Sequence, residues 1–156
     1  MKSIYDISIN SIDGELIKLE KFKGRYLLFV NVASYCGYTN QYIELQKLHD
    51  IYSELEVIGI PCNQFLFQEP FSEKKIKNFC TINYGINFLM TQKINVKGKN
   101  QHNLYKWLTV KELNNFKNSK VKWNFQKYLI NKNGKIIDYF ESNVSPLSKK
   151  ITKHII

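Results

Sequence analysis

One short apolar run, residues 26–30, constrains the fold more than any other part of the sequence. It reads Tyr-Leu-Leu-Phe-Val, with Gly24 shortly before it and polar residues soon after it. A run this short and this uniformly apolar or aromatic predicts a β-strand that is buried on both faces. Residues 40–54 then mix polar and apolar side chains over a length that favours a helix. We therefore expect a buried strand that leads into a helix.

Cys36 lies between this strand and the expected helix. Thr39 and Asn40 are good N-cap residues, so the helix N-terminus should begin close to the thiol. Unpaired backbone N–H groups and the positive end of the helix dipole favour an anion there, so Cys36 should ionise more readily than usual. The alternative is a small buried core residue, which is what most free cysteines are. This segment favours a reactive thiol and leaves the core role open.

The net charge of +10 raises the possibility of a nucleic-acid partner. Of the 23 basic residues, 22 are lysine and only Arg25 is arginine. Arginine is the usual residue for reading base edges or binding phosphate with two hydrogen bonds. The lysines are spread along the chain, with no run longer than a pair. We therefore interpret the charge as a solvated basic surface and expect no nucleic-acid partner.

The cysteine pattern predicts neither a disulfide framework nor a metal centre. Cys36, Cys62 and Cys80 are an odd number, no Cys-x-x-Cys occurs, and the histidines lie far from any cysteine. The first fifteen residues lack the apolar core of a signal peptide, and no stretch approaches the roughly 20 apolar residues of a membrane span. We expect a cytoplasmic protein with reduced thiols and no cofactor.

Other segments predict a sheet with helices on both sides, within one domain over residues 1–156. The expected elements are a β-hairpin over 4–17, strands over 55–60, 121–130 and 135–140, helices over 72–83 and 103–113, and a short last helix opened by Ser145-Pro146. Strand, helix and strand in succession imply a parallel crossover. The fold class is therefore α/β: a thioredoxin-like sandwich with a central mixed sheet flanked by helices and an N-terminal β-hairpin.

The loop after the second buried strand, residues 61–70, should lie beside Cys36. Loops beyond the carboxyl ends of parallel strands carry the ligand site of open α/β sheets, and both segments follow such strands. Gln68 can supply amide donors there. Taken alone, Gln68 and Asn124 would be ordinary loop residues, and Trp123 would be a core aromatic residue of a strand.

Three blocks of the sequence resemble the signature blocks of the glutathione peroxidase family. They read NVASYCGYT at 31–39, PCNQF followed by QEP within 61–70, and KWNFQKYLI at 122–130. The blocks occur in the family's order, and the similarity extends over nearly the whole chain. It implies a thioredoxin-like fold with Cys36 in the peroxidatic position. It also implies that the catalytic tetrad is completed by Gln68, Trp123 and Asn124.

The resemblance also implies roles for the other two cysteines. Cys80 matches the resolving cysteine of relatives that thioredoxin reduces. Cys62 matches a common third cysteine. We interpret it as structural because it follows a buried strand and Pro61, and an auxiliary role at the site is the alternative. Cys36 would form a sulfenic acid, condense with Cys80 to a disulfide, and be regenerated by thiol–disulfide exchange.

The tetrad residue types suit peroxide reduction, because amide and indole N–H groups can hold an anion without a fixed counter-charge. We expect a thiol peroxidase that reduces hydrogen peroxide and organic or lipid hydroperoxides and is regenerated by thioredoxin. Glutathione is the alternative reductant. A peroxide-sensing relay protein with little turnover is the alternative function.

Leu66 and Phe67 depart from the family pattern, because relatives usually have small residues there, often two glycines. The loop conformation is therefore in question, since glycine tolerates φ values that these residues do not. The pair should also place apolar bulk beside the site and favour bulky hydroperoxides. Leu89 replaces a common proline. The chain lacks the long insertion of tetrameric relatives, so we expect a monomer or a weak dimer.

Overall fold

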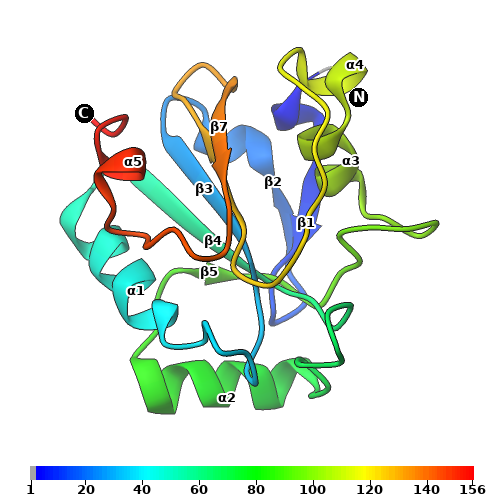
Figure 1. Cartoon of the computed structure of the whole chain (residues 1–156), viewed down its shortest axis with the longest axis vertical. Helices are drawn as coiled ribbons and strands as arrows, with labels where there is room; N and C mark the ends of the chain where they lie inside the picture. Colours follow the sequence, from blue (N-terminus) through cyan, green and yellow to red (C-terminus); the bar gives the residue numbers. More distant parts are fainter. Residues whose placement is uncertain (1–2) are drawn as a thin grey trace.

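The computed structural model describes residues 3–156, and its centre is a five-stranded mixed sheet (Figure 1). The strand order is β5-β4-β3-β6-β7. The strands are β3 (Tyr26–Val32), β4 (Leu55–Pro61), β5 (Leu89–Met90), β6 (Lys127–Ile130) and β7 (Ile136–Phe140). β3 pairs in parallel with β4 and antiparallel with β6. The expected apolar strand is therefore the middle strand.

Successive side chains of β3 point to opposite faces, and each face has its own apolar core. Leu27 and Phe29 belong to one core, whereas Leu28 and Val30 belong to the other. The first face is covered by β1 (Ser8–Asn10), β2 (Leu16–Lys18), α3 (Asn103–Thr109) and α4 (Lys111–Asn114). The second face is covered by α1 (Gln41–Ile51), α2 (Glu73–Tyr84) and α5 (Lys149–Thr152) (Figure 1). This confirms the thioredoxin-like sandwich with its N-terminal hairpin.

Two short 3₁₀ turns flank the N-terminal hairpin. Ile4–Asp6 forms the first turn, η1, and Ser3 caps it by accepting a hydrogen bond from Tyr5 N–H. The paired part of the hairpin consequently begins at Ser8, later than the predicted start at residue 4. Leu19–Phe22 forms the second turn, η2, which leads towards β3.

Three predicted elements have different boundaries in the structure. The predicted helix over 103–113 is interrupted at Val110, whose extended backbone (φ −109°, ψ 116°) separates α3 from α4. The predicted strand over 121–130 pairs only from Lys127, and Phe125 just before it has a left-handed φ of 64°. The last helix begins after Ser148, which caps it through Lys150 N–H, and not at Ser145-Pro146.

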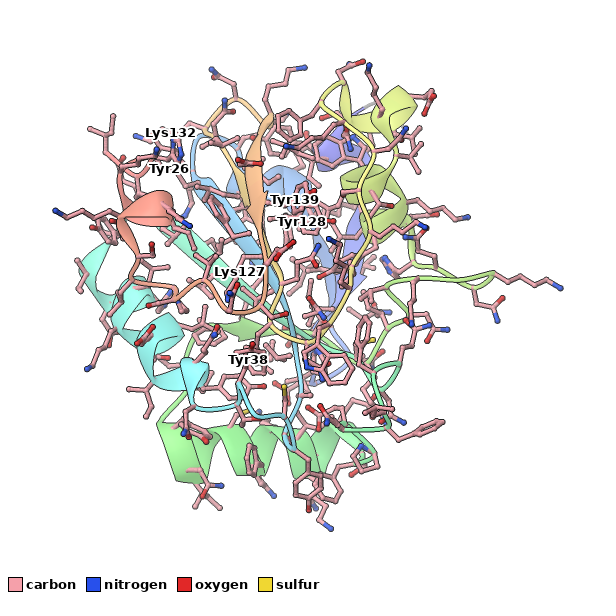
Figure 2. The ribbon with its side chains drawn as sticks, viewed as in Figure 1. Tyr26, Tyr38, Lys127, Tyr128, Lys132 and Tyr139 are labelled. Atoms are coloured by element: carbon pink, nitrogen blue, oxygen red, sulfur yellow. The ribbon has the colours of Figure 1, made fainter. Side chains whose placement is uncertain are left out.

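Lys127 is a fully buried lysine in β6 that joins three parts of the chain (Figure 2). Its Nζ donates to Gln41 Oε1 at 2.6 Å, at the start of α1. It also donates to the backbone oxygens of Ser142 at 3.0 Å and Val144 at 2.6 Å, beyond β7. An ammonium has three donors, so all of them are satisfied. Burial lowers the Lys127 pKa to about 7, and the negative charge of Glu44 opposes this shift.

Replacing Lys127 with methionine should destabilise the protein by about 3 kcal/mol, because three acceptors would lose their donor. The measurement is the free energy of unfolding from urea titration near neutral pH. Lys47, an exposed lysine on α1, provides the matched control. Lys47→Met should change the free energy by less than about 0.5 kcal/mol. Equal effects of the two substitutions would show that the Lys127 contacts contribute nothing specific.

Candidate active site

Three segments meet at one edge of the sheet because of how β3 pairs with its neighbours. Val32 at the end of β3 lies opposite Pro61 at the end of β4, and Val30 lies opposite Lys127 at the start of β6. The residues after β3, the residues after β4 and the residues before β6 therefore share this edge. Asn31 fastens the third segment, since its Nδ2 donates to Trp123 O at 3.0 Å.

Cys36 lies in a turn between β3 and α1 and is partly exposed. Tyr38 N–H donates to Cys36 Sγ at 3.4 Å, the one hydrogen bond to this sulfur within residues 3–156. Thr39 does not cap α1. Its hydroxyl accepts from Cys36 N–H at 2.9 Å and donates to Ala33 O at 2.9 Å. Asn40 occupies the N-cap position, as predicted, but makes no capping bond to α1, because its Oδ1 accepts instead from the Tyr84 hydroxyl at 3.3 Å. The thiol is therefore ordered by the turn itself.

Gln68 and Asn124 are brought together from different loops. Asn124 Nδ2 donates to Gln68 Oε1 at 2.9 Å, and Asn124 is fully buried. Tyr35 N–H, next to Cys36, donates to the Gln68 backbone oxygen at 3.0 Å. The Gln68 loop is thereby bonded to both other segments. The convergence of side-chain nitrogens on Cys36 Sγ stays a prediction.

Trp123 lines an open hollow beside the Cys36 turn. The hollow has a volume of about 290 Å³ and is lined by Tyr38, Lys122, Trp123, Gln126, Glu141, Ser142 and Asn143. The Trp123 ring also packs against Phe65, with ring centroids 5.6 Å apart. Because Tyr38 shares the hollow and bonds Cys36 Sγ, Trp123 is on the same side of the molecule as the thiol.

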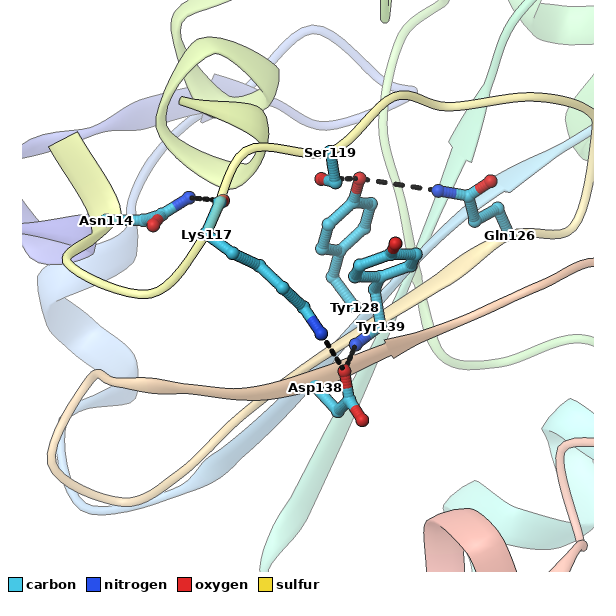
Figure 3. Close-up of polar contacts among 7 residues, drawn as sticks. All are labelled: Asn114, Lys117, Ser119, Gln126, Tyr128, Asp138 and Tyr139. Atoms are coloured by element: carbon cyan, nitrogen blue, oxygen red, sulfur yellow. Dashed lines mark hydrogen bonds and ion pairs between the residues drawn. The ribbon is translucent and has the colours of Figure 1, made fainter. Parts of the chain in front are cut away.

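Gln126 braces the segment that carries Trp123 and Asn124, although the sequence analysis did not single it out. Its Oε1 accepts from Lys122 N–H at 3.0 Å, and its Nε2 donates to Lys120 O at 2.9 Å. The same amide reaches the Tyr128 hydroxyl, which is 2.7 Å from Ser119 Oγ (Figure 3). These hydrogen bonds therefore stabilise the loop internally. The only sequence signal for a role of Gln126 was its position in the KWNFQKYLI block.

Glu69 is a second residue that the sequence analysis missed, because a glutamate in a polar loop is usually exposed. It is fully buried, and its Oε1 accepts from Ser34 Oγ at 2.7 Å. Its backbone N–H donates to Asn63 Oδ1 at 3.0 Å. Burial raises the Glu69 pKa to about 7, against the opposing effects of the Ser34 hydrogen bond and the Lys93 charge. Glu69 therefore ties the Cys36 segment to the loop that carries Gln68.

Cys62 and Cys80 are both buried, and all three cysteines are unpaired. Cys62 Sγ is 3.5 Å from Gln64 Oε1, and burial raises the pKa of Cys62. Cys80 lies within α2, where it and Ile76 are the buried residues. Burial raises the pKa of Cys80 to about 11, the Glu69 charge raises it further, and the Tyr42 hydroxyl lowers it.

Leu66 and Phe67 have left-handed φ values of 52° and 54°, a conformation that glycine adopts readily. Large side chains adopt it at a cost of about 1–2 kcal/mol each. The loop thus takes the backbone shape expected for smaller residues. Leu66 and Phe67 are 75% and 78% exposed and lie outside the lining of the Trp123 hollow. Their effect on substrate range stays a prediction.

Within residues 3–156, no group of three or more His, Cys, Asp and Glu side chains is arranged to hold a metal ion. Over the same residues, no helix is both long and apolar enough to cross a membrane.

Comparisons with known proteins agree on one family. The family model described as glutathione peroxidase matches residues 4–109. The glutathione peroxidase homolog BsaA of Bacillus subtilis (strain 168) is 42% identical over 146 residues, covering 92% of this chain and 91% of that protein. The glutathione peroxidase-like peroxiredoxin 2 of Saccharomyces cerevisiae is 40% identical over 148 residues, covering 94% and 91%.

Solved structures agree with this result. The crystal structure of T. cruzi GPX1 superposes with a TM-score of 0.75 at 31% identity, over 99% of this chain and 97% of that one. A thiol:disulfide interchange protein of the thioredoxin family from Chlorobium tepidum TLS gives a TM-score of 0.62 at 14% identity, covering 96% and 93%. At that identity the likeness shows the fold alone, and the fold is thioredoxin-like.

Glu69 should make the protein less stable as the pH rises from about 4.5 to about 7. Its pKa is about 7 in the folded protein against an ordinary value of 4.5, so the folded state holds more protons in this window. Stability then falls with pH, by up to about 3 kcal/mol. Glu69→Gln should abolish this part of the fall, because the amide mimics the neutral acid.

The measurement is urea unfolding of both proteins at pH 4.5, 6 and 8, the range set by the Glu69 pKa. Groups common to both proteins, such as His102, cancel in the difference between them. A difference that is the same at every pH would contradict the buried, proton-binding role of Glu69.

Proposed function

The chain belongs to the glutathione peroxidase family and acts as a thiol peroxidase, and we propose that Cys36 is the thiol that reduces hydrogen peroxide and organic or lipid hydroperoxides. The observation that carries this proposal is the position of Cys36. Cys36 is partly exposed, and its sulfur accepts a backbone N–H at the edge where the Gln68, Trp123 and Asn124 segments meet. A thiolate there can be reached by a peroxide and is oriented by its own turn.

In the first step, the Cys36 thiolate attacks one peroxide oxygen and the O–O bond breaks. Sulfur gains the oxygen as a sulfenic acid, and the second oxygen leaves as hydroxide or alkoxide, which takes a proton to form water or an alcohol. We assign to Gln68, Trp123 and Asn124 the donation of N–H bonds to these anions. The bond between Asn124 and Gln68 supports joint action of these two amides.

In the second step, Cys80 attacks the sulfenic acid, water leaves, and a disulfide joins Cys36 to Cys80. A disulfide requires Cα atoms within about 7 Å, and we propose that the reduced form keeps these two cysteines farther apart. While α2 is intact, burial leaves Cys80 almost wholly protonated at neutral pH, with a pKa of about 11. Local opening of α2 would both release Cys80 and let it ionise.

We further propose thioredoxin as the reductant, with glutathione as the alternative. Support comes from the yeast relative, which is named a glutathione peroxidase-like peroxiredoxin. We assign Cys62 a structural role, since it is fully buried. Three unpaired cysteines support a reducing, cytoplasmic setting. We propose that residues 1–156 act as one domain, as a monomer or a weak dimer, without a nucleic-acid partner.

Trp123→Phe should slow the reaction with hydrogen peroxide about 100-fold, because it removes one N–H donor and keeps most of the ring. The measurement is the rate of sulfenic acid formation in a single turnover. Trp107, the other tryptophan, belongs to α3 and is buried in the core, outside the lining of the hollow. Trp107→Phe should leave the rate within about twofold. Equal rates for the two variants would show that Trp123 is not part of the catalytic tetrad.

Cys80→Ser should abolish peroxide consumption supported by thioredoxin but leave one equivalent of peroxide consumed per protein. The sulfenic acid would form and then lack a resolving thiol. Steady-state assays with thioredoxin and then glutathione as sole reductant also compare the two candidates directly. Cys62→Ser is the matched control and should retain turnover with thioredoxin. If Cys80→Ser turns over normally, Cys62 or no internal thiol resolves the intermediate.

A further inference from the structure

Four large side chains form an apolar surface beside the Cys36 turn, here called the apolar tip: Tyr35, Leu66, Phe67 and Phe71. Tyr35 is 61% exposed, and Leu66 and Phe67 are more exposed still. The Tyr35 and Phe71 rings contact each other edge to face, with centroids 5.1 Å apart. The Tyr35 backbone N–H is bonded to Gln68 O, so both halves of the tip are joined. The tip thus gathers exposed apolar side chains on two loops that are hydrogen-bonded to each other, a feature typical of interaction sites.

Hydrogen bonds fix the loop that carries the tip, although Leu66 and Phe67 have strained, left-handed backbones. Glu69 is bonded to Ser34 and Asn63 on one side of the loop. Gln64 is bonded to a neighbouring segment on the other side, since its Oε1 accepts from Val96 N–H at 2.7 Å and its Nε2 donates to Lys97 O at 3.0 Å. Strained conformations of large residues persist only where the surrounding structure imposes them, and they cluster at ligand-binding sites.

Two lysines lie beside aromatic rings of the tip and its loop. Lys75 Nζ lies 4.4 Å from the centre of the Phe71 ring. Lys97 Nζ lies 4.6 Å from the centre of the Phe65 ring, next to Leu66 in the chain. Both lysines are exposed, and the nearby carboxylate of Glu69 is fully buried. The tip therefore has an ammonium group close to each of its two loops, on a chain with a net charge of +10.

We propose that the apolar tip docks the protein onto an anionic lipid surface, with Leu66 and Phe67 entering the headgroup region and Lys75 and Lys97 contacting anionic headgroups. A lysine near such a surface gains binding energy, and its long stem allows the ammonium to stay in the polar layer. A bilayer also accepts a small protrusion without a matching pocket. Docking does not require the proposed function; only its benefit, the delivery of lipid hydroperoxide to Cys36, rests on that function.

A protein partner fits these residues less well. Lysine is depleted in protein–protein interfaces, and a stable interface buries about 800 Å² on each side, more than four side chains offer. A second copy of the chain would carry the same positive charge, so two tips would repel each other. These alternatives become outcomes of the test.

The test is co-sedimentation of the reduced protein with vesicles of phosphatidylcholine alone, or of equal parts phosphatidylcholine and phosphatidylglycerol. The parent should bind the mixed vesicles, bind phosphatidylcholine far more weakly, and lose affinity as salt is added. Leu66→Asn with Phe67→Asn should lower the affinity at least tenfold, and asparagine tolerates the left-handed backbone. Lys75→Gln and Lys97→Gln should each lower it about fivefold.

Leu16→Asn with Ile51→Asn is the matched control, because both residues are 65% exposed and lie outside the tip. It should bind like the parent, and melting temperatures should show that all variants fold. Failure of the parent to bind mixed vesicles, or equal losses in both double variants, would overturn the proposal. So would a tip variant that binds vesicles normally but loses thioredoxin-supported turnover or self-association, since the partner would then be a protein.

Discussion

The hydrogen-bonded pairing of β3 with β4 on one side and β6 on the other is the constraint on which the site depends. A parallel neighbour brings one loop to the end of β3, and an antiparallel neighbour brings another. A slip of one residue would turn Leu27 and Phe29 out of their core and move Asn31 away from Trp123 O. The position of Cys36 therefore follows from strand register as much as from its own turn.

Polar groups are buried along this edge, and each fixes a loop that apolar packing alone would leave free. Glu69 and Lys127 join segments far apart in the chain, whereas Gln126 bonds within its own loop. Their burial is costly, as the raised pKa of Glu69 and the lowered pKa of Lys127 both indicate. These buried groups therefore lower stability near neutral pH but fix the loops around the thiol. Such a cost is common where function requires a geometry that hydrophobic contacts cannot specify.

The fold could be predicted from local patterns, because the run at 26–30 and the helix periodicities act over short distances. The site residues were predicted in two ways. The position of Cys36 between a buried strand and a helix suggested a reactive thiol, whereas Gln68, Trp123 and Asn124 were identified only through the family resemblance. The buried structural role of Lys127 could not be predicted from the sequence. Its acceptors include the backbone oxygens of Ser142 and Val144, and every residue type has a backbone oxygen. The loop before β6 looked like a strand because its residues alternate, and only the positive φ of Phe125 shows why pairing stops there.

Cys80 is one of the two buried side chains of α2, so the thiol also serves as an attachment point of the helix. Drawing it into a bond with Cys36 would leave Ile76 as the remaining buried anchor, beside exposed Lys74, Lys75 and Lys77. A lysine-rich segment freed in this way is what trypsin-like proteases cleave. A molecule that stays in the proposed disulfide state would therefore be cleaved sooner than one that a reductant restores promptly, and oxidation would shorten the lifetime of the protein.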